Sequence, residues 1–353
     1  MGEASETDDA KEPAAATADK LTRGPTEQCV HPYARLTPDL VLDAVERFGF
    51  LTDGRLLELN SYENRVYQVG LEDATPVVVK LYRPERWSEA QILEEHAFAL
   101  ELAEHELPVA APLRTSANGT LIEHEGFQVA VFARLGGHAP DLSMPGVLEW
   151  LGRLLGRLHA VGAVRPFRHR LAISPDTLAA DGAWLLDVGL VPAHLLPAFS
   201  SLLRDVMARV EGAFAQADGY TPIRLHGDCH AGNVLWVDHA GPRIVDLDDA
   251  RNGPAVQDLW MLLSGEREDR VRQIAELLEG YELFRLLDPR ELLLIEPLRA
   301  IRLVGYAAWL GRRWQDPAFP RAFPWFASPR YWEDLVLTLR EQLAALDEPP
   351  LPV

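Results

Sequence analysis

Hydrophobic and polar positions alternate over short distances in the first half of the chain. Between residues 56 and 133, apolar runs of a few residues are separated by polar turns, a pattern that predicts β-strands. The strands are expected near residues 56–59, 66–69, 77–82, 120–123 and 127–133. The first two flank the polar turn at 60–65, so they predict a hairpin with a long tip.

One helix is expected within this strand-rich region. Ser88 stands three residues before Gln91, an arrangement that predicts a capping box at a helix N-terminus. Apolar residues then recur at helical spacing up to about His105, among them Ile92, Ala99 and Leu102. We therefore expect a helix at about residues 89–105.

Beyond the glycine pair at 136–137 the pattern becomes helical. Leucines recur at helical spacing between residues 145 and 159, and further helices are expected near 199–216, 255–264, 267–285 and 289–314. A short β-loop-β segment at 223–246 interrupts them. Strands followed by helices favour an α+β fold over a doubly wound parallel sheet. The glycine pair is the expected hinge between a strand-rich part and a helical part.

Composition narrows the class of protein. The chain has 353 residues, of which 48% are hydrophobic and 25% charged, which is ordinary for a globular protein. The net charge of −19 disfavours nucleic acid and anionic membrane as partners. Residues 1–30 are rich in Ala, Thr, Glu, Asp and Pro, so we expect a disordered acidic tail there.

Location can also be predicted from the sequence. Only two cysteines occur, Cys29 and Cys229, so no disulfide framework is implied and a reducing compartment fits. No run of about 18 apolar residues predicts a membrane span, and the N-terminus lacks the apolar core of a signal peptide. We therefore expect a cytoplasmic protein, and we expect it to be a monomer.

The most informative residues lie in the β-loop-β segment. His226 is followed by Asp228, Asn233 comes five residues after that aspartate, and Asp246 follows an apolar strand. Phosphoryl transfer needs a carboxylate near the attacking hydroxyl and oxygen ligands for Mg²⁺ on the phosphates. Each of these residue types is also common in turns. The complete array with its flanking strands predicts a phosphotransferase site more strongly than any single member.

This array resembles the catalytic and metal-binding loops of the aminoglycoside phosphotransferase and choline kinase superfamily, which is similar to protein kinases in fold. Longer segments at 61–67, 80–87 and 246–262 resemble the bacterial stress response kinase A family. The resemblance runs from about residue 36 to residue 350. It implies a two-lobed protein-kinase-like fold with an ATP-binding lobe at 31–135 and a catalytic and substrate lobe at 136–353.

The same resemblance implies roles for single residues. Asp228 would accept the proton of the substrate hydroxyl, and Asn233 and Asp246 would hold Mg²⁺, with Asp246 essential for catalysis as well. Ser61 would lie over the phosphates of ATP, and Lys80 would contact the α- and β-phosphates. An acidic residue on the following helix would hold that lysine. Glu94 and Glu95 both qualify, and Glu95 is preferred.

The sequence differs from ordinary protein kinases in two respects. Residues 60–65 contain no glycine, so any phosphate loop there is not glycine-rich. Asp246 is separated from Pro254 by too few residues for a long activation loop, which argues against control by phosphorylation of such a loop.

Several alternatives stay open at this point. We expect ATP as co-substrate, Mg²⁺ as cofactor, and transfer to serine or threonine of protein substrates, the chain itself included. A small-molecule kinase for an aminoglycoside, choline, homoserine or a sugar would use the same residues. A pseudokinase is disfavoured because the full residue set is present.

Asp248 would either assist the metal or be an exposed structural carboxylate, and Cys229 is expected to be a packing residue with a raised pKa. The tryptophans at 309, 314, 325 and 332 are expected in the core or in the wall of a substrate cleft, and the core is favoured.

Overall fold

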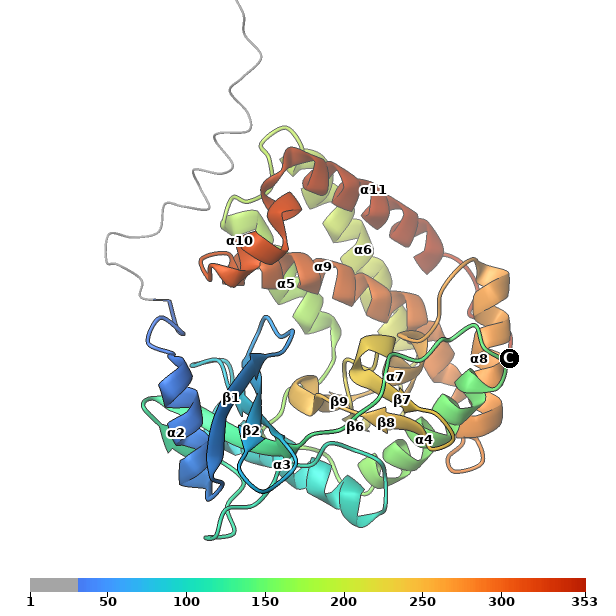
Figure 1. The fold of residues 1–353 in the computed structure, drawn as a ribbon. Coiled ribbons are helices and arrows are strands. Elements are labelled where there is room, and N and C mark those ends of the chain that lie inside the picture. Colours follow the sequence, from blue (N-terminus) through green and yellow to red (C-terminus); the bar gives the residue numbers. More distant parts are fainter. Residues whose placement is uncertain (1–30) are drawn as a thin grey trace, which may run out of the picture. The chain divides into compact units, whose positions relative to one another are not determined.

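A five-stranded antiparallel sheet forms from the predicted strand-rich region (Figure 1). The computed structural model describes residues 31–353, so the expected acidic tail at 1–30 lies outside the described residues. The strand order is β1-β2-β3-β5-β4. Their bounds are β1 (Thr52–Glu58), β2 (Arg65–Leu71), β3 (Val77–Leu81), β4 (Ile122–His124) and β5 (Phe127–Ala133). The five predicted strands and the predicted β1–β2 hairpin are thus confirmed, with small shifts of their ends.

The two faces of this sheet have different partners because side chains alternate along a strand. On β3, Val77, Val79 and Leu81 pack in one core cluster with helix α2 (Pro38–Phe48). The intervening Val78 and Lys80 point to the other face, where both line a cavity. Helix α3 (Glu89–Glu104) also contributes to this second face, because Ile92 packs with Tyr82 and Ala130 there. The alternation of β3 therefore places Lys80 in the cavity.

The two helices beside the sheet differ in how well the sequence predicted them. For α3, the capping box between Ser88 and Gln91 is present, as predicted. Helix α2 was not predicted, although its signals are in the sequence. Thr37 caps its N-terminus through an Oγ1 that accepts the N–H of Leu40, Pro38 occupies its first turn, and Gly49 ends it in the left-handed conformation.

Beyond the leucine-rich helix α4 (Val147–Gly162) and two further helices, the chain forms a series of short elements. Two small antiparallel pairs form, β6 (Ile223–Leu225) with β9 (Arg251–Gly253) and β7 (Val234–Val237) with β8 (Gly241–Ile244). The β6–β9 pair was not predicted because strands of three residues carry almost no periodic signal. Between them lie the one-turn 3₁₀ helices η1 (Ala231–Asn233) and η2 (Leu247–Asp249).

Three of the predicted helices have different bounds in the structure. Helix α7 (Val256–Trp260) is shorter than expected, and α8 (Arg267–Tyr281) ends early because the N–H groups of Phe284 and Arg285 both turn back to the carbonyl of Tyr281. The segment expected as one helix at 289–314 begins as the 3₁₀ helix η3 (Pro289–Leu294) before α9 (Ile295–Arg313). None of the helices described within residues 31–353 is long and apolar enough to cross a membrane.

The described chain divides into two compact units. One comprises Pro32–Ser174, Ala215–Ile295 and Pro349–Val353, and it contains the sheet and all candidate site residues. The other comprises His31, Pro175–Phe214 and Glu296–Glu348. The predicted lobe boundary after residue 135 stays a prediction. Gly137 next to it has a φ of 145°, and its Cα lies so close to the carbonyl oxygen of Trp236 that a Cβ would be 2.8 Å away.

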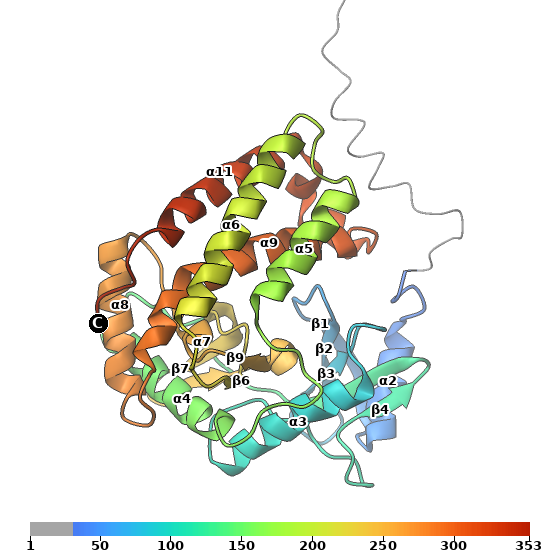
Figure 2. The same cartoon turned by 180° about the vertical axis from the view of Figure 1, so that it is seen from behind.

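The second unit is helical. It contains α5 (Pro175–Asp187), most of α6 (Leu196–Gln216), α9, α10 (Ala318–Ala322), the 3₁₀ helix η4 (Pro324–Ala327) and α11 (Pro329–Leu346), which Figure 2 shows from behind. Trp332 is fully buried there against Phe199 and Phe326, as expected for a core residue. Trp325 is 43% exposed, so the expectation that all four tryptophans belong to the core is wrong. It stands in η4, where its ring contacts the rings of Phe323 and Tyr331.

Helices α4 and α8 pack backbone to backbone through glycines. A Cβ at Gly152 would lie 2.0 Å from the carbonyl oxygen of Leu277, and one at Gly280 would lie 2.0 Å from that of Glu149. Contacts this close leave no room for a methyl group, so these glycines set the distance between the two helices. Because α4 also carries His159, the same packing positions a residue that supports the site.

Helix α7 begins over a buried carboxylate. Glu291 in η3 is 1% exposed, and its Oε2 accepts the N–H of Val256 at 2.9 Å. Burial raises the pKa of Glu291 from 4.5 to about 7. This carboxyl group therefore changes its charge near neutral pH at the start of the helix that carries Asp258.

Replacing Gly152 by alanine tests the glycine packing. Gly152→Ala should lower the stability of folding by about 1–3 kcal/mol, because the methyl group forces α4 away from α8. The matched control is Gly212→Ala in α6, where no atom lies within 4 Å of the added Cβ. That change should be neutral or stabilising by up to about 1 kcal/mol, because alanine favours the helix. Thermal unfolding of both variants measures this, and equal melting temperatures would contradict the close packing.

Replacing Glu291 by glutamine tests the shifted carboxyl group. Its proton is held more tightly in the folded chain, so stability is highest below the unfolded pKa of 4.5 and falls as pH rises through 7. The loss from this group amounts to roughly 3 kcal/mol at high pH. Glu291→Gln cannot ionise, so its stability relative to the wild type should increase between pH 5 and pH 8. Denaturant unfolding at several pH values measures this, and a difference that does not change with pH would refute it.

Candidate active site

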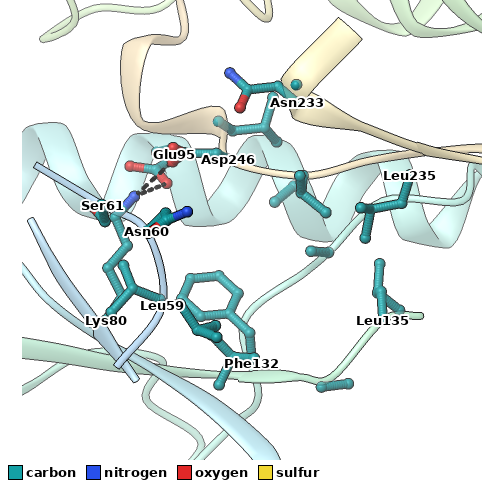
Figure 3. Close-up of a pocket in the computed structure, with 18 of the residues that line it drawn as sticks. Leu59, Asn60, Ser61, Lys80, Glu95, Phe132, Leu135, Asn233, Leu235 and Asp246 are labelled. Atoms are coloured by element: carbon teal, nitrogen blue, oxygen red, sulfur yellow. Dashed lines mark hydrogen bonds and ion pairs between the residues drawn. The ribbon is translucent and has the colours of Figure 1, made fainter. Parts of the chain in front are cut away.

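A cavity of about 290 Å³ lies against the face of the sheet from which Val78 and Lys80 project (Figure 3). Its apolar lining includes Leu59, Phe132, Leu135 and Leu235, of which Leu135 and Leu235 lie on the side away from Lys80. The other end is polar and is lined by Asn60, Ser61, Lys80, Glu95, Asn233 and Asp246. Five of the six predicted site residues thus line one cavity. The sixth, Asp228, is joined to Asn233 by a hydrogen bond from Asn233 Nδ2 to the Asp228 carbonyl oxygen of 3.0 Å.

Lys80 is buried among three carboxylates. Its Nζ lies 2.8 Å from Asp248 Oδ1, 3.2 Å from Asp246 Oδ1 and 3.7 Å from Glu95 Oε1. Burial alone would lower the pKa of Lys80, but these negative charges, Asp248 first, raise the pKa well above its usual value. The lysine is therefore always charged and available to bind an anionic group in the cavity.

The choice between Glu94 and Glu95 is decided by their positions on α3. Glu95 is 3% exposed and contacts both Lys80 and the guanidinium of Arg170, whose NH2 is 2.6 Å from Glu95 Oε2. Glu94 lies on another side of the helix and accepts the backbone N–H groups of residues 168–170 at 2.6–2.9 Å. The structure therefore pairs Lys80 with Glu95, and Glu94 holds a loop in place.

Asp248 is not the exposed structural carboxylate that the sequence left open. It is 3% exposed, and Lys80 Nζ and Arg86 NH1 lie 2.8 Å and 2.5 Å from its two oxygens. Burial would raise the pKa of Asp248, but Arg86 and Lys80 hold that pKa below its usual range. With both oxygens facing protein cations, this carboxylate is an anchor for Lys80 and is not directed toward a metal.

The loop that carries Asp228 is held by its backbone. The two oxygens of the fully buried Asp258 accept the N–H groups of His226 at 2.8 Å and Gly227 at 2.9 Å. His159 Nε2 lies 3.0 Å from Asp258 Oδ2. Asp258 therefore tethers this loop through its backbone. Gly227 has a φ of 85°, and a Cβ there would lie 2.2 Å from the carbonyl oxygen of Asp249, so only glycine allows this approach.

The imidazole of His226 hydrogen-bonds the backbone on both sides of the site. Its Nε2 donates to the carbonyl oxygen of Val245 at 2.9 Å, and its Nδ1 accepts the N–H of Asp228 at 3.3 Å. One imidazole therefore fixes the loop of Asp228 to the strand end that precedes Asp246. Neither ring nitrogen is left for acid–base work.

His230 faces the carboxylate of Asp228. Its Nδ1 accepts the N–H of Gly232 at 3.0 Å, which leaves Nε2 as the protonated nitrogen. Nε2 lies 3.5 Å from Asp228 Oδ2 and faces that carboxylate. The Asp228 side chain is 25% exposed, so it stands at the surface of the site, where an acceptor hydroxyl can reach it.

Asn233 and Asp246 offer oxygen atoms to a cation. Asn233 Nδ2 is used by the Asp228 carbonyl, so the carboxamide oxygen takes no part in that bond. Asp246 adopts the left-handed conformation with a φ of 59°, and its side chain is 52% exposed. One carboxylate and one carboxamide suit Mg²⁺, which prefers hard oxygen ligands and keeps sites for phosphate and water. The described residues contain no cluster of three or more His, Cys, Asp or Glu that could enclose a metal by themselves.

The loop at residues 60–65 is rigid although it has no glycine. Asn64 Oδ1 accepts the N–H of Arg83 at 3.0 Å, and Arg83 Nε donates to the carbonyl of Glu63 at 3.0 Å. The hydroxyl of Tyr33 donates to the same carbonyl at 3.1 Å, and the guanidinium of Arg65 lies 4.3 Å from the Tyr33 ring centre. We call residues 60–65 the phosphate loop because Ser61 projects from it into the cavity.

Cys229 is buried and chemically quiet. It is 1% exposed, and burial, followed by the negative charges of Asp258 and Asp228, raises the pKa of its thiol well above 9.0. The expectation of a packing residue with a raised pKa is confirmed. A protonated, enclosed thiol next to Asp228 is a poor nucleophile and a poor target for oxidation.

Two cations of the site were missed in the sequence. Arg86 and Arg170 both contact Asp248 or its backbone, with Arg170 NH1 at 2.5 Å from the Asp248 carbonyl. Arg86 lies in the segment at 80–87 that resembles the kinase family, and this signal could have drawn attention to it. Arg170 lies in a loop without any local pattern, so no sequence signal marks it.

Comparison with known proteins agrees with this geometry. Residues 55–294 match the model of the phosphotransferase enzyme family. Stress response kinase A of Escherichia coli K12 is 48% identical over 320 residues, which cover 90% of this chain and 96% of that protein. The serine/threonine protein kinase RdoA of Salmonella typhimurium is 47% identical over the same shares of both chains.

Solved structures show the same fold at much lower identity. Amicoumacin kinase in complex with AMP-PNP, Ca²⁺ and Ami has a TM-score of 0.69 at 18% identity, over 90% of this chain and 96% of that one. A microcompartment-associated aminopropanol kinase has a TM-score of 0.68 at 16% identity, over 88% and 98%. The predicted kinase-like α+β fold is confirmed. The chain belongs to the phosphotransferase enzyme family and is a homologue of stress response kinase A.

Proposed function

We propose that this protein is an ATP- and Mg²⁺-dependent kinase that transfers the γ-phosphoryl group to serine or threonine hydroxyls of proteins. The observation that carries the proposal is the joint placement of Lys80, Asn233 and Asp246 at the polar end of one cavity, with Asp228 joined to Asn233. Phosphoryl transfer depends on such positioning and on electrostatic stabilisation rather than on covalent chemistry of the protein.

The shape of the cavity supports a nucleotide in one orientation. The apolar side with Phe132, Leu135 and Leu235 suits an adenine ring, and the polar end suits phosphates. Lys80 carries a charge that its three carboxylate neighbours maintain, so it can bind phosphate oxygens. Ser61 and the backbone of the phosphate loop offer hydrogen-bond donors from the sheet side.

The acceptor side depends on Asp228. Its partly exposed carboxylate would accept the proton of an attacking hydroxyl, while His230 Nε2 holds one carboxylate oxygen in place. Mg²⁺, when bound by Asn233 and Asp246, supplies charge neutralisation for the phosphate oxygens. The hydrogen bonds from the backbone before Asp228 to the Asp258 carboxylate hold Asp228 in place relative to Asn233 and Asp246.

Protein substrates are favoured over small alcohols by the relatives. The two curated homologues at 47–48% identity are named as a stress response kinase and a serine/threonine protein kinase. The antibiotic and aminopropanol kinases share only 16–18% identity, which supports a common fold and not a common substrate. Autophosphorylation, a monomeric state and a cytoplasmic location remain predictions from the sequence.

Asp228→Ala should reduce phosphoryl transfer by roughly 10²–10⁴-fold, because the hydroxyl loses its general base. Nucleotide binding should stay nearly unchanged, because Asp228 faces the acceptor. The matched control is Asp238→Ala in the β7–β8 turn, whose side chain is 80% exposed. Transfer from γ-labelled ATP would be measured on the protein itself, on generic protein substrates and on a panel of small alcohols. Label only on a small alcohol would replace the protein kinase proposal, and wild-type rates in Asp228→Ala would refute the assignment of the loop.

Asp246→Ala should act on nucleotide and metal together. Removing this carboxylate leaves the cation with Asn233 alone, so the Mg²⁺ concentration for half-maximal rate should rise about tenfold or more and turnover should fall. Titration of Mg²⁺ at fixed ATP measures both effects. An unchanged Mg²⁺ requirement would show that Asp246 is not a ligand, even if the rate fell.

A further inference from the structure

The guanidinium of Arg86 joins three carboxylates from two separate segments. Its Nε lies 3.8 Å from Glu63 Oε1, its NH1 lies 2.5 Å from Asp248 Oδ2, and its NH2 lies 2.9 Å from Asp249 Oδ1. Each nitrogen thus faces a different acid. The side chain is only 14% exposed, and its guanidinium packs 5.2 Å from the ring centre of Trp87.

These three acids belong to the two segments that enclose the polar end of the cavity. Glu63 is part of the phosphate loop, next to the residues that line the cavity from the sheet side. Asp248 and Asp249 form η2, which starts directly after Asp246. We call η2 together with Asp246 the metal loop. Arg86 itself follows β3, so it is tied by its backbone to the strand of Lys80.

The ion pairs of Arg86 depend on one another. Asp248 is buried, and a buried carboxylate that loses a cation is strongly destabilised. Arg86 supplies one of its two closest cations, and the pKa of Arg86 is raised by Asp248, Asp249 and Glu63 against the opposing effect of burial. The planar guanidinium presents three separate nitrogens, each facing a different acid, and the single nitrogen of a lysine ammonium cannot reproduce that spacing.

A second arginine strengthens the connection to the phosphate loop. Arg83 Nε lies 3.1 Å from Glu63 Oε1, the same oxygen that faces Arg86. Glu63 therefore stands between Arg83, which fixes the phosphate loop to the end of β3, and Arg86, which reaches the metal loop. Movement of the phosphate loop would be transmitted to η2 through this carboxylate.

We propose that Arg86 is a positioning residue that couples the phosphate loop to the metal loop, so that Glu63 influences cation binding at Asp246 without touching the cation. The proposal deepens the kinase function given above and rests on it. It assigns to the segment at 80–87 a role beyond that of carrying Lys80.

The test compares Glu63→Gln, Arg86→Lys and the double variant with the wild type. The readout is the Mg²⁺ concentration that gives half-maximal binding of AMP-PNP, measured by fluorescence or calorimetry without any acceptor substrate. Glu63→Gln should raise this concentration about threefold, and Arg86→Lys about tenfold, as expected for groups coupled in one network. The double variant should equal Arg86→Lys, because Glu63 acts through Arg86.

The matched control is Glu85→Gln. Glu85 lies in the same turn, carries the same charge and is exposed, and no ion pair joins it to the described residues. It should keep the wild-type Mg²⁺ requirement. Melting temperatures are recorded for every variant, and if Arg86→Lys fails to fold, Arg86→Gln in combination with Glu63→Gln takes its place.

The possible results separate the proposal from the function it rests on. If Glu63→Gln behaves like the wild type, or if it still has its full effect beside Arg86→Lys, the coupling through Arg86 is refuted, the latter result pointing to Arg83. If a variant only melts earlier with an unchanged Mg²⁺ requirement, Arg86 is merely structural. If AMP-PNP does not bind the wild type at all, the proposed kinase function itself fails.

Discussion

The site depends on a buried cluster of charged side chains, and separating one of them from its partners would destabilise the fold. Lys80, Glu95 and Asp248 have side-chain exposures of 7%, 3% and 4%, and Arg170 has none. In surroundings of low polarity each charge needs its partner, and removal of one member of a buried pair typically costs about 3–5 kcal/mol. The members come from β3, α3, η2 and a loop near residue 170. Electrostatics therefore forces four segments that are distant in sequence to meet, and the cavity is the space that remains beside them.

The loop that carries Asp228 relies on the same principle, with backbone groups in place of side chains. Both oxygens of Asp258 are occupied by the N–H groups of His226 and Gly227, and His159 faces the carboxylate as well. A fully buried carboxylate with several donors tolerates few alternative loop conformations. The glycine contacts between α4 and α8 place His159 at this carboxylate. Helix packing, loop geometry and the position of Asp228 are thus linked in one chain of contacts.

Sequence reasoning succeeded where the information is local. The spacing of Asp228, Asn233 and Asp246 is set within one short segment, and the alternation of β3 directs Lys80 to a defined face. It failed where the role of a residue depends on partners that are distant in the sequence. The sequence left Asp248 open between a metal-assisting residue and an exposed structural carboxylate, because Arg86 and Arg170, which contact it, stand about 160 and 80 positions away in the chain.

Helix α2 shows a different kind of failure. The sequence contains the signals for this helix, which are a capping threonine, a proline in the first turn and a terminal glycine. The strand pattern that follows is stronger, and the helix was not predicted. The length of the 3₁₀ segment η3 and the early end of α8 depend on side-chain and backbone bonds at their termini, which periodicity does not contain. Boundaries were therefore less predictable than the presence of elements.

The rigid phosphate loop gives a physical reason for the absence of glycine. A glycine-rich loop can close over phosphates because its backbone is free, and it must lose that freedom when the nucleotide binds. Here Tyr33, Arg65, Arg83 and Asn64 fix the loop before any ligand is present. The conformational entropy of the loop is then lost when the protein folds and not when a nucleotide binds. Such a loop can adjust only together with its anchors, so ion pairs that connect it to neighbouring segments are the natural means of adjusting this site.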